Sequence, residues 1–469
     1  MKFAKLIPVI VAVSGVALAA MWLVYEPGGG DFVQRVPGQD VGKGGEVAVA
    51  QVVDLRGKLE RGEGVVAVEF ANASWPWFRG RNLDNIAPDS EAVAEWSAGG
   101  PTEVWRIELG DGYAGAAIHK GRVYVLDYDL EKRADVLRCM SLADGKEIWK
   151  RSYGVKVRFN HGRSRTIPSV TDEVVVTIGP KCHVSCVDAS TGEYRWGIDL
   201  VKEYGTTVPD WYAGQCPLIE GDRLILAPAG KDVLLMALEL GTGKVLWTVE
   251  NRHKWEMTHV SVVPMTLLGK KMYVYCGSKG VVAVDEAGGV VWEMHDWRVK
   301  MAAVASPVAV GEDLVFFCGG YGAGSMLLRV KKDAEGKFEA EEVYRLGEEE
   351  FGSEQQTPIF YGGYLYGVAP MNGGPLACLE VGTGKRVWDS GREKFGIGPY
   401  MICGGQVWLV NDKGVLTVAE ASTKGYKQLG RWELFEKGHE AWGPMAVAEG
   451  RLLVREFRRM VCLDLRAMK

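Results

Sequence analysis

The residues that could carry out chemistry are scattered along this chain, and no catalytic motif joins them. The sequence contains no His-Glu-x-x-His zinc motif and no Gly-x-Ser-x-Gly nucleophile turn. The run Gly241-Thr242-Gly243-Lys244 imitates the end of a phosphate loop, but Val245 follows where a Ser or Thr must bind magnesium. The seven histidines are far apart in the sequence. The sequence therefore predicts no catalytic residue and no metal site.

The cysteines are better explained by packing than by redox chemistry. They number nine, which is odd, so they cannot all form disulfides. Cys139, Cys186, Cys378 and Cys462 occupy matching places in a repeated pattern, where other copies have a small residue. The run from Cys182 to Cys186 does not match haem attachment, which requires Cys-x-x-Cys-His in that order. We interpret the cysteines as small buried side chains.

The elements that must position any site are indicated by a turn motif that the chain repeats. Its clearest copy is Leu142-Ala143-Asp144-Gly145-Lys146-Glu147-Ile148-Trp149, in which a strand end, a tight turn closed by Gly and a strand carrying Trp follow one another. Gly suits the positive φ angle of a short hairpin turn. The Trp is a large, rigid apolar plate that can pack between neighbouring units.

The spacing of these copies predicts the architecture. The predicted docking residues are Trp105, Trp149, Trp196, Trp247, Trp292, Trp388 and Trp432, with Tyr344 as a degenerate copy. They are 44 to 52 residues apart. A repeat of this length with several short strands is typical of a β-propeller. We therefore predict an all-β fold, an eight-bladed β-propeller of four-stranded antiparallel blades with Trp-docking motifs.

The two ends of the repeat array predict how the ring closes. Residues 102–109 form a lone strand with a docking Trp, whereas residues 442–465 supply three strands without one. Adding the N-terminal strand to the last blade leaves no sheet edge unsealed. We expect the last blade to be closed in this way.

The loops that lead into the innermost strands depart most from the repeat, and we expect them to surround the mouth of the central channel. Aromatic, amide, Arg and His side chains there would suit a polar ligand or an inserted peptide. Arg163 and Arg165 are the predicted anion contacts, because a guanidinium matches a carboxylate. The candidate binding residues are His161, Arg163, Arg165, Trp211, Tyr212, His259, Gln356, Tyr400 and Trp442.

Charge and the N-terminal region indicate where the protein works. The net charge of −5 gives no basic surface for nucleic acid. Two lysines precede a run of apolar and small residues at positions 6–25, as in a signal peptide or an N-terminal membrane anchor. We predict three parts: residues 1–25 as this leader or anchor, 26–73 as a Gly-rich tether, and 74–469 as the propeller. The protein is expected to be exported, either to the periplasm or to the cell envelope.

The repeat resembles that of the PQQ-like, or quinoprotein-type, β-propeller family. The resemblance rests on Gly121-Arg122-Val123-Tyr124-Val125, on the turns that contain Gly192 and Gly384, and on Trp75-Pro76-Trp77-Phe78-Arg79-Gly80. The last stretch is similar to exported members described as BamB-like or PQQ-binding-like. Their repeat serves blade docking rather than chemistry, so the resemblance implies the fold more directly than the function.

The resemblance implies two functions of different classes. One is a non-catalytic, protein-binding scaffold of the outer-membrane assembly machinery. The other is an alcohol or sugar dehydrogenase with PQQ and Ca²⁺ over the ring centre, for which the family places adjacent cysteines beneath the quinone. No two cysteines are adjacent here, and no calcium-binding set stands out. We expect a monomeric, exported scaffold without a cofactor that binds an envelope protein or peptide; the dehydrogenase and a carbohydrate- or peptide-binding propeller are the alternatives.

Overall fold

The computed structural model describes residues 16, 53–87, 96 and 100–466. The chain divides into two compact units, residues 1–50 and 51–469, and all the described residues except Val16 belong to the second. The predicted leader or anchor at residues 1–25 is outside the described residues, apart from Val16. Among the helices of the described part, none combines the length and apolar character needed to cross a membrane.

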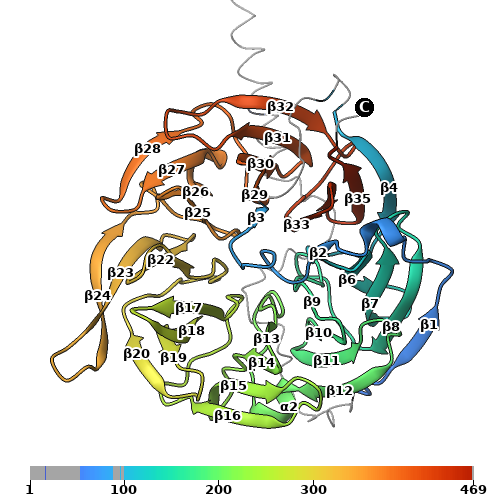
Figure 1. The fold of residues 1–469 in the computed structure, drawn as a ribbon, viewed down its shortest axis with the longest axis horizontal. Helices are drawn as coiled ribbons and strands as arrows, with labels where there is room; N and C mark the ends of the chain where they lie inside the picture. The colour runs from blue at the N-terminus through green and yellow to red at the C-terminus, as the bar shows by residue number, and fades with distance from the viewer. Residues whose placement is uncertain (1–15, 17–52, 88–95, 97–99, 467–469) are drawn as a thin grey trace, which may run out of the picture. The chain divides into compact units, whose positions relative to one another are not determined.

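The second unit is an eight-bladed β-propeller (Figure 1), as predicted. In each blade the first strand lies nearest the axis and the fourth at the rim. Blade 1 contains β5 (Ala116–His119), β6 (Arg122–Asp129), β7 (Ala134–Ser141) and β8 (Glu147–Gly154). Blade 2 contains β9 (Ser169–Val170), β10 (Val174–Ile178), β11 (His183–Asp188) and β12 (Tyr194–Asp199). Blade 3 contains β13 (Leu218–Glu220), β14 (Arg223–Leu226), β15 (Val233–Glu239) and β16 (Val245–Glu250).

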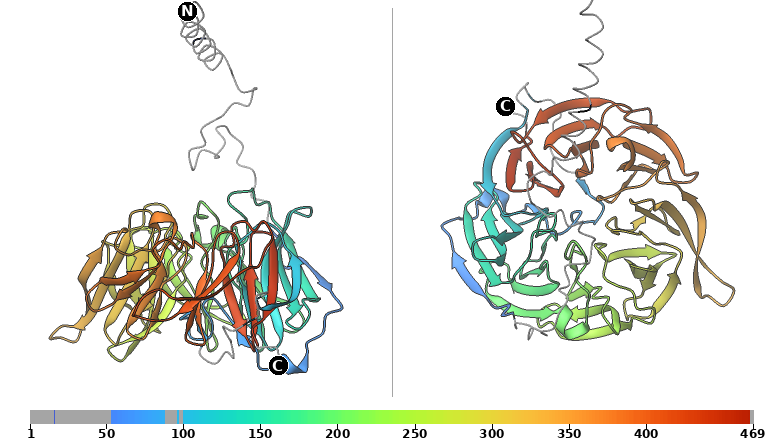
Figure 2. Two further views of the ribbon diagram at one scale, coloured as in Figure 1. Left: turned by 90° about the horizontal axis from the view of Figure 1, so that it is seen from above. Right: turned by 180° about the vertical axis from the view of Figure 1, so that it is seen from behind.

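The remaining blades follow the same order around the ring, and the two further views show the blades side by side (Figure 2). Blade 4 contains β17 (Val263–Leu267), β18 (Lys270–Gly277), β19 (Gly280–Val284) and β20 (Val290–Met294). Blade 5 contains β21 (Val308–Ala309), β22 (Leu314–Gly319), β23 (Gly324–Lys332) and β24 (Phe338–Leu346). Blade 6 contains β25 (Ile359–Tyr361), β26 (Tyr364–Val368), β27 (Leu376–Glu380) and β28 (Lys385–Asp389). Blade 7 contains β29 (Tyr400–Cys403), β30 (Gln406–Val410), β31 (Val415–Glu420) and β32 (Gln428–Glu433).

Blade 8 confirms the predicted closure. It contains β33 (Gly443–Ala448), β34 (Arg451–Arg455) and β35 (Arg459–Asp464), and its fourth strand is β4 (Thr102–Glu108) from the other end of the repeat array. β4 pairs antiparallel with β35, and Cys462 lies opposite Trp105. Because one blade combines both ends of the repeat array, its hydrogen bonds hold the ring closed.

The middle strands of the blades are buried on both faces, which explains their continuous apolar sequences. All five residues of β10 are buried, as are all five of β19. The rim strands alternate instead, and in β20 only Trp292 is buried. All nine cysteines are buried, and those at the matching places lie in middle strands, as the packing interpretation predicts.

Three short strands before the first blade attach the N-terminal region to the ring. β1 (Lys58–Arg61) pairs with the rim strand β8, so the folded unit includes part of the segment that the sequence analysis interprets as a tether. β2 (Ser74–Trp75) pairs with β5 of blade 1. β3 (Ile86–Ala87) pairs in parallel with β29 of blade 7. The chain between β2 and β3 therefore crosses the middle of the ring (Figure 1).

Trp docking links successive blades through one recurring contact. Trp149 of blade 1 donates its indole N–H to the carbonyl of Ser190 in the turn of blade 2, at 3.1 Å. A Cβ built on Gly192 in that turn, where φ is +72°, would lie 2.7 Å from the Trp149 ring. Only Gly fits both the turn and the ring at this place. Equivalent bonds join Trp105 to Leu142, Trp196 to Leu240, Trp247 to Glu286 and Trp388 to Ser422.

Blade 5 differs from the other blades in its last hairpin, and Tyr344 stands there in place of the docking Trp. Its last hairpin is longer and has a charged turn, and within the described part of the chain the buried N–H of Trp292 has no hydrogen-bond partner. Tyr344 of blade 5 nevertheless repeats the docking bond, because its hydroxyl donates to the carbonyl of Val381 at 2.8 Å. Trp432 of blade 7 contacts Gly100 and Trp96, which precede β4.

Candidate ligand pocket on the ring axis

A pocket of about 300 Å³ lies where the eight blades converge. We call the segments that precede the first strand of each blade the axial loops. They are residues 109–115, 155–168, 200–217, 251–262, 295–307, 347–358, 390–399 and 434–442. Each axial loop contributes at least one residue to the lining, which places the pocket on the axis. The loop at 200–217 is shaped by the short helix α2 (Leu200–Tyr204), whose first turn is capped by the Asp199 carboxylate.

The segment that crosses the ring also contributes to the lining. Phe78 borders the pocket, and the next residue, Arg79, is buried. The Arg79 guanidinium donates to the carbonyls of Asp84 and Pro358, at 3.2 and 3.1 Å. Burial lowers its pKa to about 10, so it keeps its charge at neutral pH. These bonds fix the segment to itself and to blade 6, and they hold Phe78 in place.

Arg165 is the cation of the pocket. It donates to the backbone carbonyls of Trp211, Asn160 and His161, and the guanidinium carbon lies 5.0 Å from the centre of the Tyr113 ring. Burial lowers its pKa to about 10, which leaves it charged at neutral pH. Among the described residues, no carboxylate forms an ion pair with it, and its Nη1 has no hydrogen-bond partner. A half-buried cation held only by carbonyls and a ring face can still accept an anionic partner.

The other titratable groups of the pocket add little negative charge. Glu354 lines the pocket, and burial raises the pKa of its carboxyl group. Burial also lowers the pKa of His259 to about 4, with a further contribution from Arg165, so this imidazole is neutral at neutral pH. Within the described part, the buried Nδ1 of His259 has no hydrogen-bond partner. The walls include five large aromatic side chains, Phe78, Tyr113, Trp211, Tyr321 and Trp442.

The structure brings six of the nine predicted binding residues together around this pocket. They are His161, Arg165, Trp211, His259, Gln356 and Trp442. Two of them also contact one another, because the side-chain amide of Gln356 donates to the carbonyl of Trp442 at 3.2 Å. Whether these residues bind a ligand stays a prediction.

The other three predicted residues lie outside the lining and have structural contacts instead. Arg163 donates to the buried carboxylate of Asp111 at 2.6 Å and packs between the rings of Tyr128 and Phe159. The Tyr212 hydroxyl donates to the carbonyl of Arg158 at 2.7 Å. Tyr400 is 1% exposed in strand β29. The sequence could not separate Arg163 from Arg165, because both lie in one loop and only the fold shows which points to the axis.

Sequence reasoning missed part of the lining. Tyr321 belongs to the turn between β22 and β23, outside the axial loops, and its hydroxyl accepts from Gln355 at 3.3 Å. Phe78 and Tyr113 were visible only as members of aromatic and glycine-rich stretches before the first blade. A search for aromatic residues just after β4 would have found Tyr113, whose hydroxyl donates to the carboxylate of Glu440 at 2.5 Å.

The lining does not fit a calcium-bound quinone. Calcium takes six to eight oxygen ligands and prefers charged carboxylates. Glu354 is the one carboxylate among the lining residues, and its raised pKa weakens it as a ligand. Cys216 is the one lining thiol, and its burial raises its pKa to about 11. The pocket supplies neither a cluster of carboxylates nor a pair of cysteines.

Comparison with known proteins identifies the family. Residues 132–390, more than half of the chain, match the family described as outer membrane protein assembly factor BamB. This chain belongs to that family. The predicted family resemblance is therefore confirmed.

A curated relative shares sequence similarity with part of the chain. A curated relative, the quinoprotein alcohol dehydrogenase PedH of Pseudomonas putida, is 26% identical over 170 residues, or 34% of this chain. That match spans 27% of the length of PedH.

Solved structures share the fold at low sequence identity. BamB from Moraxella catarrhalis is 14% identical with a TM-score of 0.52, and the match covers 77% of this chain and 99% of that one. A quinohemoprotein alcohol dehydrogenase from Comamonas testosteroni is 12% identical with a TM-score of 0.56, covering 84% of this chain and 81% of that one. At these identities the likeness extends to the fold alone.

Proposed function

We propose that this protein is a non-catalytic binding propeller of the cell envelope that holds a partner protein through the axial pocket. The observation that carries the proposal is Arg165, a half-buried guanidinium in the pocket wall without a carboxylate partner among the described residues. Hydrogen bonds between a guanidinium and a carboxylate are strong in a site with little water. Trp211 and Trp442 beside it offer apolar surface. The pocket therefore suits a partner segment that carries a carboxylate next to an apolar side chain.

The family membership supports a scaffold role, because the family is described as an outer membrane protein assembly factor. The sequence of residues 1–25 supports an envelope location, since two lysines precede a long apolar run there. The absence of a fitting carboxylate set around the pocket, within the described residues, supports a binding role rather than turnover.

Affinity capture from solubilised envelopes of the organism that carries the gene tests this function. We expect the wild-type protein to retain the same envelope protein in replicate experiments, and Arg165→Gln and Trp211→Ala to lose most of it. Arg252→Gln is the matched control, because Arg252 is exposed and forms an ion pair with Glu250 away from the pocket lining. Equal capture by all four proteins, each with a wild-type circular dichroism spectrum, would contradict a role for the pocket.

The second candidate function is a quinoprotein dehydrogenase, which the 170-residue match to PedH favours. Titration of the purified protein with PQQ and Ca²⁺, followed by Trp fluorescence and a dye-linked alcohol assay, distinguishes the two. We expect no saturable binding and no turnover. Tight binding with turnover would make this protein an enzyme.

A further inference from the structure

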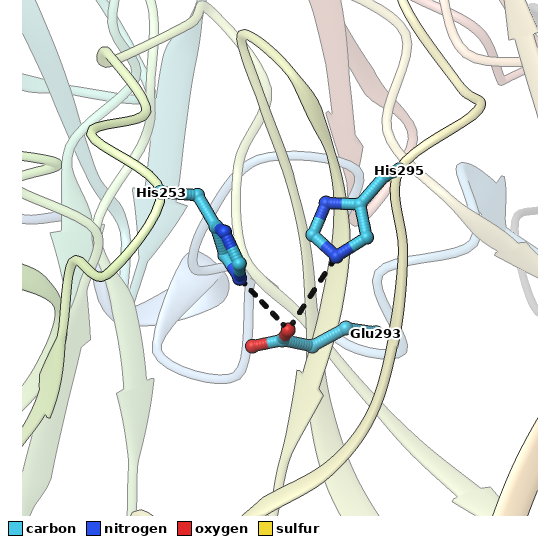
Figure 3. A group of neighbouring side chains, drawn as sticks. All are labelled: His253, Glu293 and His295. Atoms are coloured by element: carbon cyan, nitrogen blue, oxygen red, sulfur yellow. Dashed lines mark hydrogen bonds and ion pairs between the residues drawn. The ribbon is translucent and has the colours of Figure 1, made fainter.

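A cluster of two histidines and a glutamate lies outside the lining of the axial pocket. Glu293 is in the rim strand β20 of blade 4, and His295 follows that strand directly. His253 comes three residues after the rim strand β16 of blade 3. The fold brings the two chain segments together, and both imidazoles point toward the Glu293 carboxylate (Figure 3).

The two distances from the histidines to Glu293 are close to the spacing of ligands around a tetrahedral metal ion. Nε2 of His253 is 3.2 Å from Oε2 of Glu293, and Nε2 of His295 is 3.7 Å from the same oxygen. All three candidate ligand atoms lie within 4.8 Å of one another. With zinc–ligand bonds of about 2.0–2.1 Å, the edge of a tetrahedron is about 3.3–3.4 Å. The distances of 3.2 and 3.7 Å lie on either side of this value, and the two imidazole nitrogens lie within 4.8 Å of each other, so side-chain rotations can bring the three atoms around one ion.

The surrounding contacts hold the cluster in position. Trp255 is buried, and its ring lies 5.9 Å from that of His253 and 5.7 Å from that of His295. The turn that carries His253 is fixed by Asn251, whose side chain bonds the backbone N–H and carbonyl of Trp255. Glu293 is fixed by its pairing with Val282 in the sheet. These three side chains therefore lose less conformational freedom when they bind an ion than three unconstrained surface side chains would.

The exposure of the three side chains and the charge around them also suit the binding of a cation. The side chains of His253, Glu293 and His295 are 43%, 27% and 45% exposed, so an ion can enter and keep a water ligand. The nearby Lys254 and Lys279 direct their ammonium groups to the backbone carbonyls of Lys231 and Lys254, rather than to Glu293. The carboxylate thus has its two histidines as ion-pair partners in the described part of the chain.

We propose that His253, Glu293 and His295 bind a Zn²⁺ ion with a fourth position open to water. Two imidazoles and one carboxylate are zinc ligands, whereas Mg²⁺ and Ca²⁺ prefer oxygen ligands alone. Because His253 follows blade 3 and the other two residues belong to blade 4, the ion links neighbouring blades. An ion that binds only the folded state stabilises it. This site is independent of the axial pocket and of the function proposed for it.

Isothermal titration of the metal-free, untagged full chain with ZnCl₂ tests the proposal. We expect one strong site, and at least about tenfold weaker binding in both His253→Gln and His295→Gln, because loss of an outer partner of a ligand alone costs 10–100-fold. His439→Gln is the matched control. His439 is also exposed and lies 3.8 Å from a glutamate, Glu440, but no second histidine joins that pair in the described residues.

Cobalt reports the geometry directly. We expect Co²⁺ to give the intense visible absorption of a tetrahedral site in the wild-type and His439→Gln proteins, and EDTA to remove it. We also expect Zn²⁺ to raise the unfolding temperature of these two proteins and to leave that of His253→Gln unchanged. Zinc binding that is absent in the wild type, or equally strong in all variants, would overturn the proposal.

Discussion

The docking bond between blades leads to a prediction that can be quantified within one protein. Trp149 and Trp292 are both buried docking residues, but only Trp149 donates its N–H to a carbonyl of the next blade, at 3.1 Å. The N–H of Trp292 has no partner among the described residues. Replacing each Trp by Phe removes the same ring atoms, so the difference between the two variants isolates the hydrogen bond.

The expected magnitude follows from the hydrogen bond that is lost. Trp149→Phe removes a part-buried bond to the carbonyl of Ser190, an exposed residue that water can reach, and the net contribution of such a bond is about 0.5–1.5 kcal/mol. Trp292→Phe removes a buried donor that has no partner, so it loses packing but no hydrogen bond. We therefore expect Trp149→Phe to lower the free energy of unfolding by about 0.5–1.5 kcal/mol more than Trp292→Phe.

Urea denaturation followed by far-ultraviolet circular dichroism measures this difference, because the signal comes mainly from the backbone, whereas Trp fluorescence would change directly with the substitution. The comparison requires that both variants keep the wild-type dependence on urea concentration. Equal losses of stability in the two variants, or a larger loss in Trp292→Phe, would refute the reasoning that the turn carbonyl secures the blades.

Two further predictions concern a buried acid and a turn glycine. Asp135 is buried, and desolvation raises its pKa to about 7 although it accepts a hydrogen bond from Tyr153. The protonated Asp135 costs no stability below about pH 4, and stability is lost as the pH rises toward 7 because the folded protein must then bury a charged carboxylate. Thermal unfolding should therefore show that Asp135→Asn stabilises the protein at pH 8, by up to about 4 kcal/mol for three pKa units, and changes its stability little at pH 4. A similar effect at both pH values would contradict this. Gly192→Ala should have a urea midpoint well below that of Gly221→Ala. Both glycines have positive φ, but a Cβ at Gly192 would lie 2.7 Å from the Trp149 ring, whereas nothing lies within 4 Å of a Cβ at Gly221. Equal midpoints would argue that contact with the ring is not the reason for glycine at position 192.

The repeat made the fold predictable, since one turn with a Gly and a Trp recurs at each blade. Even the weak copy at Tyr344 marked a true docking position, because a phenol can donate to the same carbonyl as an indole. The strap formed by β1, β2 and β3 was not predictable, because these strands have two to four residues and pair with strands far away in the sequence.

The pocket was predictable in outline. Loops that lead to the innermost strands must meet at the axis, and this places Arg165, Trp211 and Trp442 together. The direction of each side chain within a loop was not predictable, as Arg163 and Tyr212 show. The zinc candidate depends on neighbouring rim strands, so His253 and His295 look unrelated until the repeats are aligned with the fold.

The measurement that tests the central claim most directly is photo-crosslinking from inside the axial pocket in intact cells. A benzoylphenylalanine placed at Trp211, which lines the pocket, should form a crosslink to one envelope protein, and Arg165→Gln in the same chain should reduce it. The same probe at Val245, on the exposed rim strand β16, is the control and should not give that product. A crosslink from Val245 but none from Trp211 would contradict the claim that the axial pocket holds the partner.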